Sequence, residues 1–179
     1  YSLAGLYSRG KGEPQDAGKA LELYTLAAAQ GFPYAAWELG KRYRDGIGCA
    51  VDGRQAARYF SAAYDGFRTL ADQRPDDRLQ YRIGWMLLHG VGTERDETAA
   101  LEWLEKSAEL KNPYAEYQMA KHILVDPAAS AEQTHQAVGW LTHAAEAGLD
   151  CAQHALGKLY RDGGPVVQDM AQAVIWFSQ

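Results

Sequence analysis

A combination of hydrophobic and small residues recurs along the chain at nearly constant spacing. Each copy has an apolar residue followed by a small one, and a further apolar or aromatic residue three positions later. The pairs are Leu3-Ala4, Leu39-Gly40, Ile83-Gly84, Met119-Ala120 and Leu156-Gly157. Successive pairs lie 36, 44, 36 and 37 residues apart, a period that is typical of helical repeat arrays.

The second half of each repeat predicts an amphipathic helix. Two bulky residues follow a small residue at the third and fourth positions, and another small residue comes at the seventh, so all four lie on one helical face. The first bulky position is occupied by Leu23, Tyr59, Trp103, Trp140 and Trp176. The next is occupied by Tyr24, Phe60, Leu104, Leu141 and Phe177. We expect the three tryptophans to be core residues, and the small residues to let the helices approach closely.

Cap and turn residues predict where these helices begin and end. Four aspartates are placed to cap the amides at the start of the second helices, namely Asp16, Asp52, Asp96 and Asp169. The fourth repeat has no such aspartate but offers a capping box of Ser130 and Gln133. Glycine pairs supply the turn inside a repeat, at Gly10 with Gly12, Gly46 with Gly48, and Gly90 with Gly92. The second helices are expected to end at Gly31, Gly66 and Gly148, with Pro33 and Pro113 opening the helices that follow.

Together these signals predict an all-α fold in which helix–turn–helix units stack on one another. The expected domain is a single array over 1–179, with repeats at approximately 1–31, 32–67, 77–111, 112–148 and 149–179, or about four and a half copies. We expect a fragment of a longer protein, because the pattern starts inside a first helix and stops inside a second. The long spacing through 67–78 predicts a lengthened helix with a looser turn rather than a dedicated binding loop. Asp126-Pro127 replaces the glycine turn of the fourth repeat, so that turn must differ.

The ordered pattern resembles the Sel-one-like repeat family, a relative of the tetratricopeptide repeat. The best-matching stretch runs from Leu39 to Gly48 with Asp52, and residues 20–31 carry the second-helix part. The resemblance covers nearly the whole chain and suggests a bacterial protein. It implies an α/α superhelical solenoid, right-handed, whose first helices line the concave side. It also implies an adaptor or scaffold that binds another protein.

Composition excludes several other functions. The formal net charge of −5 argues against nucleic-acid binding, and no apolar run approaches the roughly 20 residues of a membrane-spanning helix. Cys49 and Cys151 are expected to be unpaired thiols. No nucleophile motif, phosphate loop or dinucleotide fingerprint is present, and the five histidines lack metal-ligand spacing. We therefore expect no catalysis, metal or cofactor, while the cellular compartment stays open.

A basic and partly aromatic set on the first helices is the candidate binding site. Trp85 occupies a position that is Lys41, Lys121 and Lys158 in other repeats. The full set is Trp85, Met86, Arg82, His89, Lys41, Arg42, Lys121, His122 and Lys158. An aromatic residue with a methionine at a position otherwise polar is typical of a binding hot spot. The alternatives are a solvated helix face, or a Trp85 that the 67–78 connection covers.

Three functions remain open on this pattern. The first is a protein-binding adaptor whose concave groove takes an acidic or extended segment of a partner, with Trp85 as the apolar anchor. The second is an immunity-type inhibitor that wraps and neutralises a secreted toxin. The third is binding of a glycan or peptidoglycan by the aromatic residues of the groove.

Overall fold

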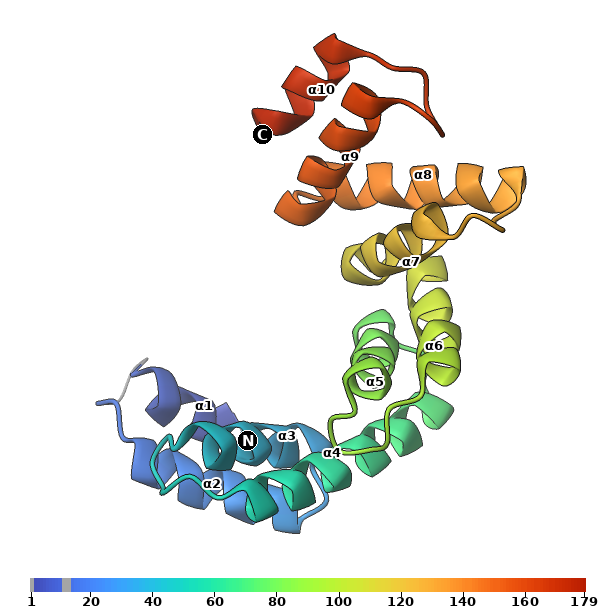
Figure 1. Ribbon diagram of the computed structural model, residues 1–179. Coiled ribbons are helices and arrows are strands. Elements are labelled where there is room, and N and C mark those ends of the chain that lie inside the picture. Colours follow the sequence, from blue (N-terminus) through green and yellow to red (C-terminus); the bar gives the residue numbers. More distant parts are fainter. Residues whose placement is uncertain (1, 11–13) are drawn as a thin grey trace. The chain divides into compact units, whose positions relative to one another are not determined.

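The protein is built from ten α-helices in the residues that the computed structural model describes, which are 2–10 and 14–179. Gly12 of the predicted pattern lies outside these residues. The helices are α1 (Ser2–Arg9), α2 (Ala17–Ala29), α3 (Pro33–Asp45), α4 (Gly53–Gln73), α5 (Asp77–His89), α6 (Glu97–Glu109), α7 (Pro113–Val125), α8 (Ala131–Glu146), α9 (Asp150–Asp162) and α10 (Met170–Phe177). They pack as successive pairs joined by short turns (Figure 1). The predicted all-α repeat solenoid is confirmed.

The chain divides into two compact units. Unit 1 contains the described residues up to 75 together with 85–97, and unit 2 contains 76–84 and 98–179. The core of unit 1 includes Ala4, Ala20, Tyr24, Ala27, Ala35 and Leu39. In unit 2 one cluster joins α6 and α7 through Leu104, Ala108, Ala115 and Met119. A second joins α7, α8 and α9 through Ala120, Ala137, Leu141, Ala144, Ala145, Ala152 and Leu156.

Most predicted helix caps are present. The Asp16, Asp52 and Asp169 carboxylates accept hydrogen bonds from the first amides of α2, α4 and α10. Ser130 and Gln133 form the capping box of α8. Pro33 and Pro113 are the first residues of α3 and α7. Helix α7 ends before Asp126. Where other repeats have a glycine turn, the Asp126 carboxylate accepts a hydrogen bond from the amide of Ala128.

Small residues of the first helices receive bulky residues of the second helices in the same repeat. A methyl group added to Gly40 would lie 2.6 Å from the Phe60 ring, and one on Gly84 would lie 2.8 Å from Leu104. Gly157 meets Phe177 in the same way. This close packing explains why small and bulky positions are paired, because only a missing side chain lets the two helices approach so closely.

Two expectations about the second helices are wrong. Trp103, Trp140 and Trp176 are half-buried and not fully buried core residues, although Trp140 and Trp176 pack against the core from its edge. The next position on the helix points into the core, where Tyr24, Phe60, Leu104 and Leu141 are buried. Gly66 does not end a helix, since α4 continues to Gln73. Gly66 instead makes room for Pro33, because a Cβ atom added to Gly66 would lie 2.7 Å from the Cβ of Pro33. The predicted lengthened helix is confirmed, since α4 has 21 residues and α2 has 13.

No described helix combines the length and apolar character that spanning a bilayer requires. Among the described residues Cys49 and Cys151 are both free thiols.

Candidate protein-binding surface

Arg42, predicted to face a partner, is a packing residue. It is 4% exposed, and its guanidinium donates to the Ser8 hydroxyl at 2.6 Å and to the carbonyls of Ala17 and Ile47 at 3.4 and 3.3 Å. It also lies 5.1 Å from the centre of the Tyr24 ring. The expectation of a solvent-facing Arg42 is therefore wrong, because this cation holds the first two repeats together.

Met86, at the equivalent position of α5, is fully buried, so its predicted exposure is also wrong. Neighbouring Trp85 is half-buried. The edge of its ring meets Trp37 of α3, with centroids 6.0 Å apart, and the exposed His89 ring lies 4.5 Å away. Lys41 of α3 is paired with Glu38 at 2.7 Å. In unit 1, most of the predicted binding positions are therefore engaged in contacts within the protein.

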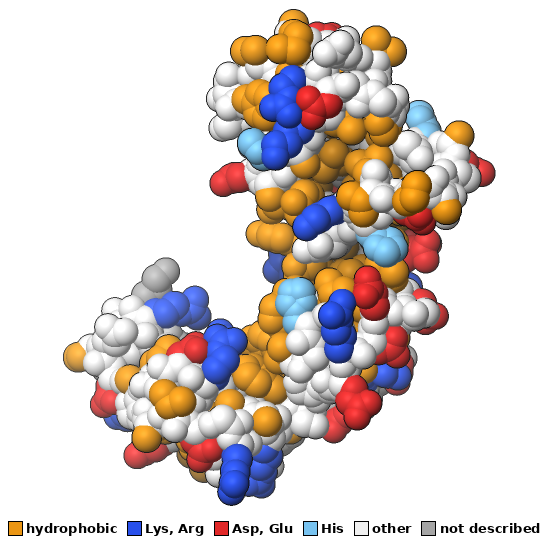
Figure 2. Space-filling model, in the orientation of Figure 1, with side chains coloured by type: hydrophobic (Ala, Val, Ile, Leu, Met, Phe, Trp, Pro, Cys, Tyr) orange, Lys and Arg blue, Asp and Glu red, His pale blue; other side chains and the backbone are white. Residues whose placement is uncertain are grey.

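Unit 2 leaves its first helices more open. Lys121 and His122 of α7 and Lys158 of α9 are exposed. Tyr117 stands four residues before Lys121, on the same face of α7, and burial and the neighbouring Cys151 thiol raise its pKa. Figure 2 shows basic side chains among apolar ones over α9. We call Tyr81, Tyr114, Tyr117, Lys121 and Lys158 the first-helix surface of unit 2.

A pocket of about 620 Å³ adjoins this surface at the starts of α5 and α7. Three cations and two tyrosines contribute to its lining, together with Asp77, Asn112 and Pro113: they are Arg78, Arg82, Lys111, Tyr81 and Tyr114. The Tyr81 and Tyr114 ring centroids are 5.7 Å apart. Burial raises the pKa of Tyr81, and nearby Tyr114 and Cys151 add to this while Arg82 opposes it. We call this cavity the α5–α7 pocket.

A second pocket of unit 2, of about 390 Å³, lies where the end of α6, the start of α7 and α8 meet. Its lining includes Glu116, which is 3% exposed, and His143, whose Nδ1 lies 2.5 Å from the Glu116 Oε2. Lys111 and Trp140 also line it. The pair ties α7 to α8 and satisfies a carboxylate that would otherwise be buried alone.

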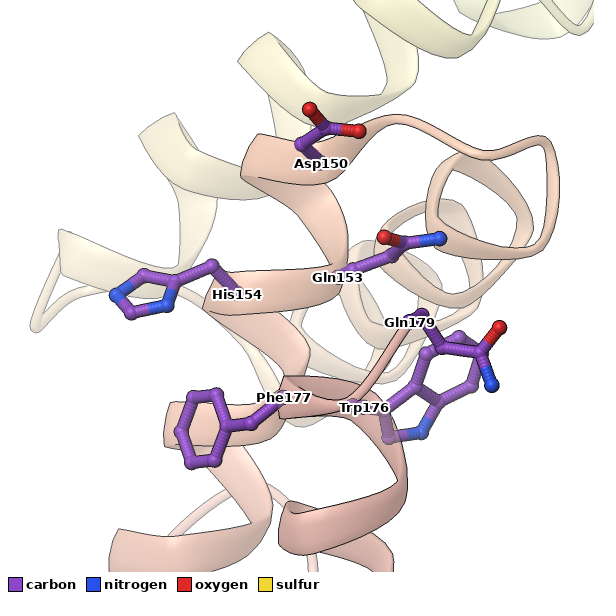
Figure 3. Close-up of a pocket in the computed structure, with 6 residues that line it drawn as sticks. All are labelled: Asp150, Gln153, His154, Trp176, Phe177 and Gln179. Atoms are coloured by element: carbon purple, nitrogen blue, oxygen red, sulfur yellow. The ribbon is translucent and has the colours of Figure 1, made fainter.

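A third pocket of about 270 Å³ lies between α9 and α10. Gln153, Trp176 and Gln179 extend to one side of this helix pair, and His154 and Phe177 extend to the other (Figure 3). Glycan binding, the third function left open by the sequence, stays a prediction. In the part of the chain that is described, no group of three His, Cys, Asp or Glu side chains could hold a metal ion.

The repeat pattern matches a family model along most of its length. The model for the Sel1 repeat matches residues 1–32, 33–66, 78–112, 113–149 and 152–179. The chain belongs to the Sel1 repeat family. A solved Sel1 repeat protein from Oxalobacter formigenes is 24% identical, with a TM-score of 0.73 over 99% of this chain and 69% of that one.

Two further proteins are similar over nearly the whole array. The immunity protein Pa5087 of Pseudomonas aeruginosa is 21% identical, with a TM-score of 0.54, over 98% of this chain and 64% of that one. The chitin synthase regulatory factor 3 of Schizosaccharomyces pombe is 26% identical over 92% of this chain. This Sel1 array spans only 18% of the length of that relative.

Most of the α5–α7 pocket was not predicted from the sequence. Of its cations only Arg82 was expected, while Arg78 and Lys111 were not. One signal was available: Lys111 stands where the first and fourth repeats have Gly31 and Gly148. A long charged side chain in a glycine position indicates a local role that the repeat itself does not require.

Proposed function

We propose that this Sel1 array is a protein-binding scaffold whose partner docks on the first-helix surface of unit 2. Sel1 repeat proteins generally mediate protein–protein interactions, and the family is typically non-enzymatic. The observation that carries the proposal is the contrast in exposure. Lys121 and Lys158 are exposed, whereas Arg42 is buried within the fold.

The chemistry of this surface favours an acidic or extended segment of the partner. Tyrosine and arginine are enriched in interface hot spots, because they combine a large contact area with hydrogen bonding. Tyr114 is 53% exposed and offers such a ring beside the cations. Exposed lysines increase the rate of encounter with an acidic partner even where they add little affinity.

Capture from a lysate of the source cell tests the proposal. The bait variant Tyr117→Ala, Lys121→Glu, Lys158→Glu removes one ring and reverses two charges on the first-helix surface. A matched variant, Arg58→Glu with Lys106→Glu, makes the same charge change at exposed positions of second helices α4 and α6. We expect a partner that wild type and the matched variant retain and that the first variant loses.

A photo-crosslinking residue at position 121 or 106 adds a positional readout. Crosslinks to the captured partner from 121 and not from 106 are the expected result. Equal capture by all baits, or crosslinks from 106 alone, would move the binding surface to the second helices and contradict the proposal.

A second candidate function is toxin neutralisation. The reason to consider it is that the fold of an immunity protein of Pseudomonas aeruginosa is similar over 98% of this chain, at 21% identity. An inhibitor of this kind binds one partner tightly, with a Kd on the order of 1 nM or below, because it must block its target fully. Calorimetry on the captured partner distinguishes the two functions, since weaker or multivalent binding favours the scaffold.

A further inference from the structure

Lys111 adopts a backbone conformation that glycine adopts at the equivalent positions of two other repeats in this chain. Its φ is +62°, and it is the one non-glycine residue with positive φ in the described part of the chain. The equivalent Gly31 and Gly148 have φ of +82° and +84°. All three turns close in the same way: the Lys111 amide donates to Ala108 and the Asn112 amide donates to Ser107.

At this turn the requirement on the backbone is distinct from any role of the side chain. The turn needs only the left-handed conformation, which glycine adopts without steric cost and lysine does not. A methyl group added to Gly31 or Gly148 would meet nothing within 4 Å, so local packing does not call for a side chain there. Strain retained at a pocket points to a role for the side chain that carries it.

The Lys111 side chain lines the α5–α7 pocket together with Arg78 and Arg82. Among the described residues, neither Lys111 nor Arg78 has an ion pair or a side-chain hydrogen bond. The one carboxylate of the lining, Asp77, already accepts a hydrogen bond from the Asn112 amide group at 2.9 Å. The pocket therefore carries an excess of positive charge, and the hydrogen-bond donors of Lys111 and Arg78 are available to a ligand.

The walls of the pocket are held in place by hydrogen bonds. The Ser107 hydroxyl donates to the Asp77 carbonyl at 2.6 Å, which ties α6 to the start of α5. Asn112 is 3% exposed, and its side-chain oxygen accepts the amides of Tyr114 and Ala115 at the start of α7. A preformed site loses less entropy when its ligand binds.

We propose that the α5–α7 pocket is a carboxylate-binding subsite that receives an Asp or Glu side chain of the partner segment, with Tyr114 packing against the residue next to it. The proposal rests on the proposed function and names the chemistry of the partner at one place. The guanidinium of Arg78 and the ammonium of Lys111 supply charge-assisted donors for the carboxylate. The Tyr81 hydroxyl, which also lines the pocket, is a further donor.

The size of the pocket favours a peptide over a single small anion. Its volume of about 620 Å³ lies in the range of sites that hold drug-sized ligands. The exposed ring of Tyr114 adds an apolar contact that phosphate cannot use.

The test uses a labelled synthetic peptide rich in Glu and Leu, and a matched peptide in which Gln replaces every Glu. Fluorescence anisotropy measures their binding to wild type, Lys111→Gly, Arg78→Gln and the control Arg58→Gln, which changes an exposed cation of α4. We expect the affinity of the Glu peptide for wild type and for the control to be at least about ten-fold higher than its affinity for the two pocket variants. The Gln peptide should bind all four weakly.

Lys111→Gly gives an additional readout, because glycine relieves the strain. Its melting temperature should rise by about 2–4 °C while its affinity for the Glu peptide falls. A loss of affinity in a more stable protein cannot be ascribed to misfolding. Amide shifts at Asn112 and Tyr114 on titration with the Glu peptide would place the ligand in the pocket.

Three outcomes would overturn the proposal: equal binding of the Glu and Gln peptides, full affinity in Lys111→Gly, or displacement of the Glu peptide by millimolar phosphate alone. The last would identify a general anion site. If the captured partner still depends on Lys121 and Lys158 while the Glu peptide fails to bind, the proposed function stands and the subsite is rejected.

Discussion

Helices α3 and α7 are first helices of different repeats with the same pattern, yet they use equivalent positions in opposite ways. In α3, Arg42 is buried among Ser8, Ala17 and Ile47, and Lys41 is paired with Glu38. In α7 the equivalent His122 and Lys121 are exposed. A column of polar residues in a repeat alignment is therefore no guide to exposure, because a long side chain can bridge to a neighbouring repeat in one copy and be solvated in another.

The strongest test of this contrast is truncation at the two equivalent positions. Arg42→Ala removes charge-assisted hydrogen bonds to three oxygens and leaves a cavity, so we expect it to lower the free energy of unfolding by about 3 kcal/mol. His122→Ala should change it by no more than about 0.5 kcal/mol. Urea denaturation measures both. Similar values for the two variants would show that Arg42 does not hold the first repeats together.

Charge reversal compares the same two helices in binding. Lys121→Glu with Lys158→Glu should weaken binding of an acidic partner about ten-fold, or about 1.4 kcal/mol, with a smaller dependence on salt. Lys41→Glu should have a lesser effect, because Glu38 already neutralises that lysine. Titration calorimetry at two salt concentrations measures this. A larger loss with Lys41→Glu would place the binding surface in unit 1.

Substitutions in the turns after the second helices should change the free energy of unfolding by less, and in opposite directions. Lys111→Gly should raise the free energy of unfolding by about 1 kcal/mol, and Gly148→Lys should lower it by about the same amount, because each exchange moves a side chain out of or into the left-handed region. Thermal denaturation of the pair measures this. Changes of equal sign in both variants would rule out backbone strain at Lys111.

The smallest effect concerns pH. Burial raises the pKa of Tyr81 above its ordinary value of 10.0, so the unfolded chain releases this proton at a lower pH than the folded chain. The contribution of protonated Tyr81 to the free energy of unfolding is thus fully present below pH 10, and it is lost as pH rises through the raised pKa. Tyr81→Phe should make that fall shallower in denaturation curves between pH 9 and about 11. An unchanged slope would mean that other tyrosines, among them Tyr43 and Tyr117 with pKa values also raised, dominate.

Local signals along the chain were enough to predict the repeat and its helix boundaries. The caps at Asp16, Asp52, Asp169 and Ser130, and the helix starts at Pro33 and Pro113, depend on residues within one turn of each other. These signals can be recognised in the sequence because each depends on interactions between residues within one helical turn. The family followed from the same pattern, since small and bulky positions must alternate wherever two helices of a repeat touch.

Which of two adjacent positions on a helix is buried depends on the packing between helices. Trp103 and Leu104 are neighbours on one apolar face, and a hydrophobic period cannot tell that Leu104 faces the core while Trp103 lies at its edge. The same limit applied to Met86 and Arg42. It also applied to the α5–α7 pocket, which joins the start of α5 to the start of α7 and the turn before it. Burial and pocket formation depend on how neighbouring repeats close over a residue, and that is a property of contacts distant in sequence.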